Sequence, residues 1–261
     1  LKYLIYLEMA QNFTHAGDIK FAKKTMEKAE DISDMNDGHT IFNHIDRYFI
    51  KAKIQKEDGD YENAIKYADT SIKNDNSILG KVLAKMVKAQ VLLRDSKIEQ
   101  AKECMNLSDQ EEEAVINADS TVYIKYLIVK AIISTEQHDL MNSEKILTKC
   151  QEVIKNSEAN GYDISKSYEA EVVAAFGDYY TAHGNLIEAN THYIMALNLY
   201  KEFMIQLQND TISLLLLKLS RNMKNLGSIY DFEKYKHLHL EIMGSSHFRT
   251  KEIYSLKYGT N

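Results

Sequence analysis

The chain has 261 residues, 44% of them hydrophobic and 27% charged, so it can bury a substantial core. It has no proline, no tryptophan and only 10 glycines, which weighs against a turn-rich β fold and favours long helices joined by short polar turns. The net charge of −6 gives no basic surplus for direct nucleic-acid binding, and no apolar run reaches the roughly 18 residues of a membrane span.

The start of the chain and its cysteines give expectations about cellular context. No signal peptide is recognisable, and Cys104 and Cys150 each fall inside a helical pattern. We expect two buried thiols in a reducing compartment and therefore a cytoplasmic protein. Because the chain opens on Leu1 and enters a helix at once, we also expect it to be a piece of a longer protein.

The first predicted pair of helices covers residues 3–36. Its turn is Gly17-Asp18-Ile19, with Ala10 seven residues before Gly17 and Ala22 five residues after it. Small residues at these two places let antiparallel helices approach closely, and larger side chains between them fill the remaining space.

The same arrangement recurs along the chain. Four further predicted pairs cover residues 45–78, 82–115, 124–157 and 170–203. Their turns are Gly59-Asp60-Tyr61, Ser96-Lys97-Ile98, His138-Asp139-Leu140 and Gly184-Asn185-Leu186. The small residues that follow these turns are Ala64, Ala101, Ser143 and Ala189. A degenerate sixth copy is predicted at 212–243, with its turn near Tyr230-Asp231-Phe232, and a capping helix at 245–258.

This recurring unit resembles the tetratricopeptide repeat, a helix–turn–helix unit with small and aromatic residues at fixed places. The resemblance implies an all-α, right-handed superhelical solenoid of antiparallel helix pairs. We expect it to form one domain over residues 1–261, closed by the C-terminal capping helix. Proline-free, irregular repeats of this kind resemble those of bacterial signalling regulators, especially peptide-sensing regulators and repeat domains attached to transcription factors.

The repeats are longer than usual. The small residues at 22, 64, 101, 143 and 189 are spaced by 42, 37, 42 and 46 residues, against a family period of about 34. Residues 106–120 (NLSDQEEEAVINADS) are the clearest candidate for an extended connection. We expect their acidic run to be the solvated start of a helix.

In such a solenoid the first helices of the pairs line a concave groove. The residues three before and one after the small residue of each first helix are expected to face this groove. They are Leu7, Gln11, Phe49, Lys53, Met86, Gln90, Ile128, Ile132, Ala174 and Asp178, joined by Lys56 one turn beyond Lys53. This mixture of apolar, amide and charged side chains suits an extended peptide. Chaperone-binding members of the family hold a C-terminal carboxylate with a basic and an asparagine residue; here Leu7 and Gln11, or Phe49 and Lys53, stand in their place.

No motif for catalysis or metal binding stands out. The sequence has no glycine-rich phosphate loop, no Gly-x-Ser-x-Gly elbow and no cysteine pair with zinc spacing. His237 and His239 are two residues apart on a predicted helix, so they point in different directions and cannot share one ion. We therefore predict no catalytic, cofactor-binding or metal-binding residue, and no enzyme.

Three functions remain open. The first, which we favour, is a protein- or peptide-binding module that forms the sensing or interaction part of a bacterial signalling or transcription regulator. The second is a scaffold that assembles, for example as a homodimer, through its ends and without a groove ligand. The third is a protein like the regulatory phosphatases that share this repeat, although the N-terminal helical bundle carrying their active residue is not found here. We find no DNA-binding helix-turn-helix in the chain.

Overall fold

A computed structural model describes residues 2–15, 17–35, 46–162, 164–202 and 209–245. These residues form 13 α-helices, and no strand occurs among them. The chain divides into two compact units, residues 1–162 and residues 163–261. A single domain over residues 1–261 stays a prediction.

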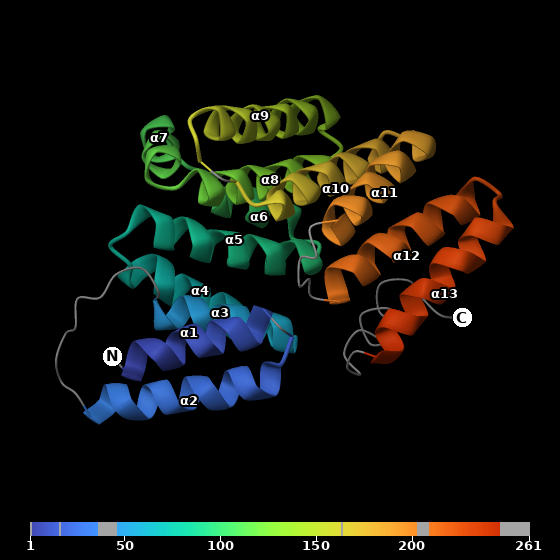
Figure 1. Cartoon of the computed structure of the whole chain (residues 1–261). Helices are drawn as coiled ribbons and strands as arrows, with labels where there is room; N and C mark the ends of the chain where they lie inside the picture. The colour runs from blue at the N-terminus through green and yellow to red at the C-terminus, as the bar shows by residue number, and fades with distance from the viewer. Residues whose placement is uncertain (1, 16, 36–45, 163, 203–208, 246–261) are drawn as a thin grey trace. The chain divides into compact units, whose positions relative to one another are not determined.

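The helices of the first unit follow one another in pairs joined by short turns (Figure 1). They are α1 (Lys2–His15), α2 (Ile19–Met35), α3 (Arg47–Asp58), α4 (Tyr61–Asn74), α5 (Ile78–Arg94), α6 (Ile98–Cys104), α7 (Asp109–Ala118), α8 (Ser120–Glu136) and α9 (Leu140–Ala159). Within the pairs, α1 packs on α2, α3 on α4, α5 on α6 and α8 on α9. The first helices of successive pairs also contact one another: α1 with α3, α3 with α5, and α5 with α8.

The second unit contains two further pairs within its described residues. They are α10 (Lys166–Ala182) with α11 (Leu186–Glu202), and α12 (Asn209–Asn225) with α13 (Ile229–Ser245). The two pairs are in contact through α11 and α12. The predicted all-α fold of antiparallel helix pairs is thus confirmed. The predicted capping helix at 245–258 lies outside the described residues, apart from Ser245 at the end of α13.

The turn inside each pair uses a left-handed backbone position. Glycine adopts this conformation without steric cost, and φ is 76° at Gly17, 85° at Gly59 and 84° at Gly184. In the two pairs that lack the glycine, Ser96 and His138 take the same place, each with φ of 58°. These five positions are the ones at which the repeating pattern puts the turns. His138 therefore forms part of the turn between α8 and α9.

The sixth pair turns earlier than the sequence pattern suggested. Gly227 is the left-handed residue, with φ of 77°, and α13 begins at Ile229, so Tyr230 lies in the first turn of that helix. Phe232 stands five residues after Gly227, where the other pairs carry alanine or serine. This large side chain at the small-residue place explains why the sixth copy is hard to recognise from sequence.

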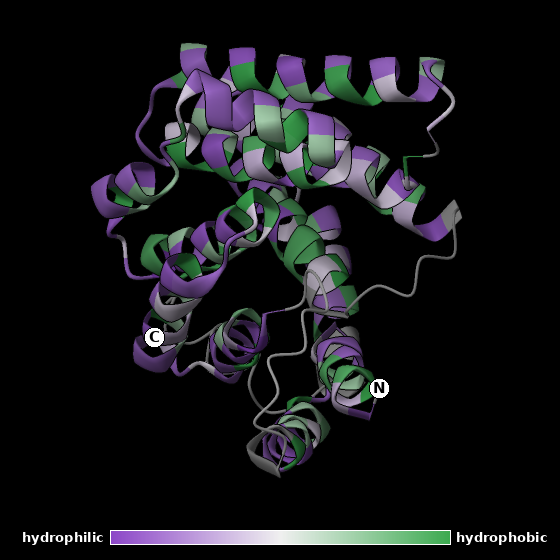
Figure 2. Cartoon of the chain, turned by 90° about the vertical axis from the view of Figure 1, so that its left-hand side faces the viewer, coloured by the Kyte–Doolittle hydropathy of each residue, from purple (hydrophilic) through white to green (hydrophobic). Residues whose placement is uncertain are grey.

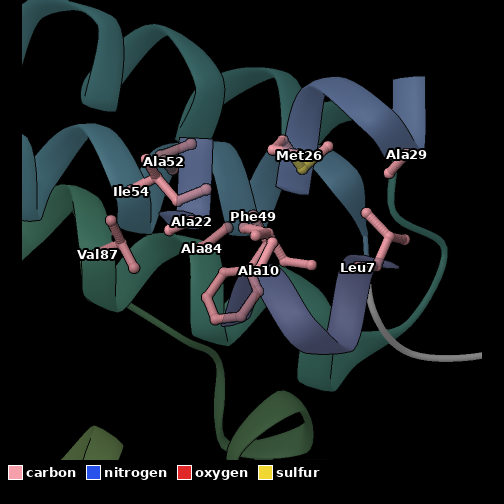
Figure 3. Packing of buried hydrophobic residues seen from close by; sticks show 12 residues of the cluster. Leu7, Ala10, Ala22, Met26, Ala29, Phe49, Ala52, Ile54, Ala84 and Val87 are labelled. Carbon is pink, nitrogen blue, oxygen red and sulfur yellow. The ribbon is translucent and has the colours of Figure 1, made fainter. Parts of the chain in front are cut away.

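Alanines at the helix contacts are completely buried. In the first unit, Ala10, Ala22 and Ala52 have no exposed surface, and Leu7 and Phe49 belong to the same buried cluster (Figure 3). Hydrophobic and hydrophilic residues alternate along the individual helices (Figure 2), as expected of helices that bury one side. The small-residue pattern of the sequence therefore marks the helix–helix contacts.

In the second unit, α10 and α11 approach closely at Gly177. A Cβ atom added there would lie 2.4 Å from Cε1 of Tyr193, far inside van der Waals contact. The Tyr193 side chain is 1% exposed, and its hydroxyl donates a hydrogen bond of 2.7 Å to Oδ1 of Asp178. The first helix thus needs a residue without a side chain where the aromatic ring of the second helix packs.

Residues 106–120 contain an additional helix, α7. Ser108 caps α7, and its backbone N–H donates to the Glu111 carboxylate while its hydroxyl accepts from the Glu111 backbone N–H, which is a capping box. Carboxylates in the first turn also suit the positive end of the helix dipole. The acidic run is thus the start of a helix, as predicted.

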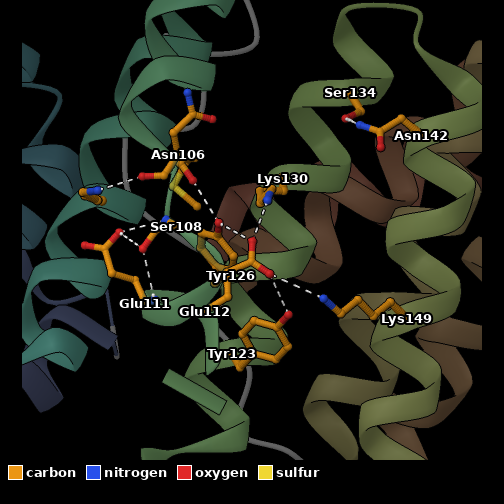
Figure 4. Close-up of polar contacts among 12 residues, drawn as sticks. Asn106, Ser108, Glu111, Glu112, Tyr123, Tyr126, Lys130, Ser134, Asn142 and Lys149 are labelled. Carbon is orange, nitrogen blue, oxygen red and sulfur yellow. Dashed lines mark hydrogen bonds and ion pairs between the residues drawn. The ribbon is translucent and has the colours of Figure 1, made fainter. Parts of the chain in front are cut away.

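One carboxylate of this run, Glu112, is not simply solvated. It accepts hydrogen bonds from the Tyr123 hydroxyl (2.9 Å), the Tyr126 hydroxyl (3.0 Å) and the Lys130 ammonium (2.8 Å), all on α8 (Figure 4). Burial alone would raise the pKa of Glu112, but the hydrogen bond and charge of Lys130 and the two tyrosine hydroxyls outweigh it and lower the pKa to about 2. Lys149 of α9 adds a longer ion pair of 3.4 Å. Glu112 therefore fixes α7 against the fourth pair.

Candidate functional site

The four apolar residues expected to face a groove in the first unit are buried. Leu7, Phe49, Met86 and Ile128 are between 1% and 8% exposed. Each precedes the small residue of its helix by three positions, which is a rotation of about 60° from the helix contact at 3.6 residues per turn. Such a side chain stays within the buried sector, so these four residues pack in the core and do not line an open surface.

The polar residues one position after the small residue emerge further from the core. Gln11, Lys53 and Gln90 are half-buried, as is Lys56 one turn beyond Lys53. They lie about 100° from the small residue of their helix, at the border of the buried sector. Ile132 of α8 and Ala174 of α10 are half-buried as well.

Contacts across neighbouring first helices bring several of these side chains together. Lys56 Nζ donates a hydrogen bond of 2.9 Å to Oε1 of Gln90, which joins α3 to α5. Lys53 Nζ contacts Nε2 of His15, which joins α3 to α1. The residues predicted at positions 53, 56 and 90 therefore belong to one polar row across the first helices.

A fourth first helix, α8, contributes Lys125, whose charge acts on both His15 and Lys53. We call His15, Lys53, Lys56 and Lys125 the basic cluster. Glu57 is the carboxylate whose charge acts on the same two groups. Three helices of the first unit, α1, α3 and α8, thus supply a histidine and three lysines whose charges act on one another, in a chain whose net charge is −6.

The protonation of the basic cluster reflects partial burial and mutual repulsion. Desolvation, followed by the charges of Lys56 and Lys125, lowers the pKa of Lys53 to about 7, with Glu57 acting in the opposite direction. Desolvation, followed by Lys53 and the other two lysines, lowers the pKa of His15 to about 4. At neutral pH, His15 is therefore neutral and Lys53 is divided between its charged and neutral forms.

Two members of the basic cluster were not among the predicted site residues. His15 had no recognisable partner in the sequence, because Lys53 lies 38 residues away along the chain. Lys125 precedes Ile128 by three residues, about one helical turn. This step runs in the opposite direction along the helix from the step that leads from Lys53 to Lys56, so the same extension would not have found Lys125.

Asp178, the predicted site residue of α10, lies in the second unit. Lys218 Nζ of α12 reaches both of its carboxylate oxygens, at 2.6 and 2.8 Å, and the Tyr193 hydroxyl of α11 donates at 2.7 Å. Asn222 of α12 donates to the Thr181 hydroxyl of α10 at 3.2 Å nearby. The Asp178 carboxylate therefore ties three helices of its own unit together.

One buried histidine and the two cysteines have structural surroundings. His239 is buried, with Nδ1 at 2.9 Å from the Ser213 carbonyl oxygen. Cys150 is buried, and desolvation raises the pKa of its thiol to about 12, while Cys104 is half-buried with its pKa also raised by desolvation. Among the described residues, no group of three or more His, Cys, Asp or Glu side chains is placed to hold a metal ion. No described helix combines the length and apolarity needed to cross a membrane.

Comparisons with known proteins bear on the fold. The sequence matches no protein-family model and no curated protein sequence. A Rap protein complexed with competence and sporulation factor is similar in structure, with a TM-score of 0.64 and 10% identity over 93% of this chain and 76% of the other. BtubC (BKLC) from P. vanneervenii has a TM-score of 0.55 and 12% identity over 94% of this chain and 93% of the other. At such low identity these similarities show the fold alone, and they confirm the predicted tetratricopeptide-like fold of helix pairs.

Proposed function

We propose that the chain is a non-enzymatic module that binds an extended peptide or protein segment along the first helices α1, α3, α5 and α8. The observation that carries this proposal is the polar row formed by His15, Lys53, Lys56 and Gln90, which crosses three successive first helices through direct contacts. Stacked helix pairs curve so that equivalent positions of the first helices line one wall. A segment lying along that wall meets one polar side chain after another.

An extended segment requires such a wall. When it binds, its backbone N–H and C=O groups lose hydration, and an unpaired buried polar group costs about 1–3 kcal/mol. Amide and ammonium side chains such as Gln90 and Lys53 can replace those hydrogen bonds, while the stems of the lysines offer apolar contact. The similar fold of a Rap protein complexed with competence and sporulation factor supports a ligand-binding role for this architecture.

We also propose a cellular role for the chain. Ligand binding without catalytic residues fits the sensing or interaction part of a bacterial signalling or transcription regulator in the cytoplasm. A scaffold without a groove ligand is the competing function. It predicts that replacing the first-helix side chains does not change the affinity for a peptide.

The test is a titration of matched variants against a peptide ligand selected by display screening on the full chain. Lys53→Ala and Gln90→Ala should weaken binding by about tenfold or more, because desolvated polar contacts are worth about 2–5 kcal/mol when a charge is involved. Lys66→Ala and Glu99→Ala on the second helices α4 and α6 are exposed controls that should change affinity by less than about threefold. Equal affinity of all four variants would contradict binding along the first helices and favour the scaffold.

A further inference from the structure

The amine of Lys53 has an uncommon neighbour for a lysine. Elsewhere in the first unit, lysines pair with carboxylates, as Lys23 does with Asp58 at 2.6 Å. Lys53 Nζ on α3 instead contacts Nε2 of His15 on α1, within hydrogen-bond reach. A base beside an amine makes the amine a better nucleophile, because the base takes the proton that the nitrogen loses when it reacts.

The contact between Lys53 and His15 is open to small molecules. It lies at the surface of the first unit, where the His15 side chain is exposed and the Lys53 side chain is half-buried. Partial burial removes some of the water that stabilises an ammonium ion, and it therefore favours the neutral amine. The pair thus combines a partly desolvated amine with access from solvent.

The protonation of both groups at neutral pH suits a reaction of the amine. Desolvation, followed by the charges of Lys56 on α3 and Lys125 on α8, lowers the pKa of Lys53 to about 7, and Glu57 on α3 acts in the opposite direction. About half of the Lys53 amines are then neutral at pH 7, roughly a thousandfold the neutral fraction of an ordinary lysine with a pKa of about 10.4. The pKa of His15 is lowered to about 4, so its imidazole is neutral and able to accept a proton.

We propose that Lys53 is an acylation site, at which its amine takes the acyl group of a small acyl thioester while His15 acts as the base. The neutral amine attacks the carbonyl carbon of the thioester and forms a C–N bond. Nε2 of His15 takes the proton that the amine nitrogen loses, and the C–S bond breaks. The proton then passes from His15 to the departing thiolate, so the products are an amide on Lys53 and a free thiol.

A thioester is the acyl donor that suits this pair. Amines displace its thiolate more readily than water does, so the reaction needs a neutral amine and a proton acceptor and no further group. Acylation removes the charge of a lysine and consumes its amine, so each chain reacts once at this site. The reaction requires no bound segment and is therefore separate from the proposed function.

The test measures acetylation of the full chain by S-acetyl-N-acetylcysteamine, a small acetyl thioester, with mass spectrometry giving the rate at each lysine. At pH 7, Lys53 should react about tenfold or more faster than the exposed Lys66 on α4. This ratio is smaller than the ratio of neutral fractions, because a less basic amine is also a weaker nucleophile. The rate at Lys53 should level off above about pH 7, whereas the rate at an ordinary exposed lysine keeps rising through pH 9.

A variant and a denaturant separate the base from the fold. His15→Gln should slow acetylation of Lys53 by about tenfold or more, without moving the pH at which the rate levels off, since the charges that lower the pKa of Lys53 come from other residues. His183→Gln, in the second unit, is the matched control and should leave the rate at Lys53 unchanged. In concentrated urea the advantage of Lys53 should disappear, because it depends on the folded contact between α1 and α3.

Other results would overturn the inference. Equal rates at Lys53 and Lys66 at pH 7, or a rate at Lys53 that keeps rising through pH 9, would contradict a reactive amine at this position. An unchanged rate in His15→Gln would contradict the role of His15 as the base. An advantage of Lys53 that persists in urea would assign its reactivity to the local sequence and contradict the folded pair.

Discussion

Replacing Gly177 with alanine should destabilise the second unit, although alanine is ordinarily the better helix residue. The added Cβ would lie 2.4 Å from Cε1 and 2.5 Å from Cδ1 of Tyr193. The ring has little freedom to move, because it is 1% exposed and its hydroxyl is bonded to Asp178. Overpacking costs about 1–3 kcal/mol, and the helix preference of alanine returns roughly 0.5–1 kcal/mol. We expect a net loss of about 1–2 kcal/mol in the free energy of unfolding.

Urea unfolding of the full chain, followed by circular dichroism, measures this change. A Tyr193→Leu background provides the control, because a smaller side chain at 193 gives the new methyl group room. In that background Gly177→Ala should cost clearly less than in the parent. If Gly177→Ala instead raises stability by about 1 kcal/mol in the parent, as alanine does in an uncrowded helix, the close approach of α10 and α11 is wrong.

Three further predictions concern stability in the same assay. Ala64→Leu and Ala189→Leu, at fully buried positions, should each lower the free energy of unfolding by about 1–3 kcal/mol. The exposed Ala159→Leu should change it by less than about 0.5 kcal/mol. Similar free energies of unfolding for all three variants would refute the assignment of Ala64 and Ala189 to the helix contacts. Because the pKa of Lys53 is about 7 in the folded chain and near 10.5 when unfolded, the unfolded state binds more protons between these values. The free energy of unfolding should therefore rise between pH 7 and 10.5, and Lys53→Met should flatten this rise. Glu112→Gln should cost about 1–3 kcal/mol at pH 7. Since the folded pKa of Glu112 is about 2, the parent should lose that contribution as the pH falls from 4.5 towards 2, and Glu112→Gln should lack this loss. A Glu112→Gln variant that loses stability over this pH range as steeply as the parent would contradict the role of the carboxylate.

The helix pairs could be predicted from the sequence because they follow local rules. Ala22, Ala64 and Ala189 recur at a fixed distance after the turns, and the fully buried surface of each shows what this spacing means. Even Ser96 and His138, which replace glycine, adopt the left-handed turn, since the surrounding helices determine the conformation there. The sixth turn was misplaced because Phe232 occupies the small-residue place.

The site was predicted less well because it depends on the angle around each helix and on contacts between helices. Leu7 and Ile128 were expected on an open wall, but about 60° of rotation leaves them in the core. Lys53 and Gln90 were predicted from their positions in the repeat alone, and their role in binding stays a prediction. That Lys53 would meet His15 and be influenced by Lys125 depends on how α1, α3 and α8 lie in the folded unit, which no local pattern encodes.

Photo-crosslinking tests the central claim, binding along the first helices, most directly. The peptide ligand selected by display screening carries a benzophenone group and is irradiated with the full chain at pH 7. The crosslinked residues are then mapped by mass spectrometry. The account predicts crosslinks on the first helices of the first unit, α1, α3, α5 and α8, around Lys53 and Gln90, and their loss in Lys53→Gln. Crosslinks confined to the second helices α2, α4 and α9, or unchanged by Lys53→Gln, would contradict it.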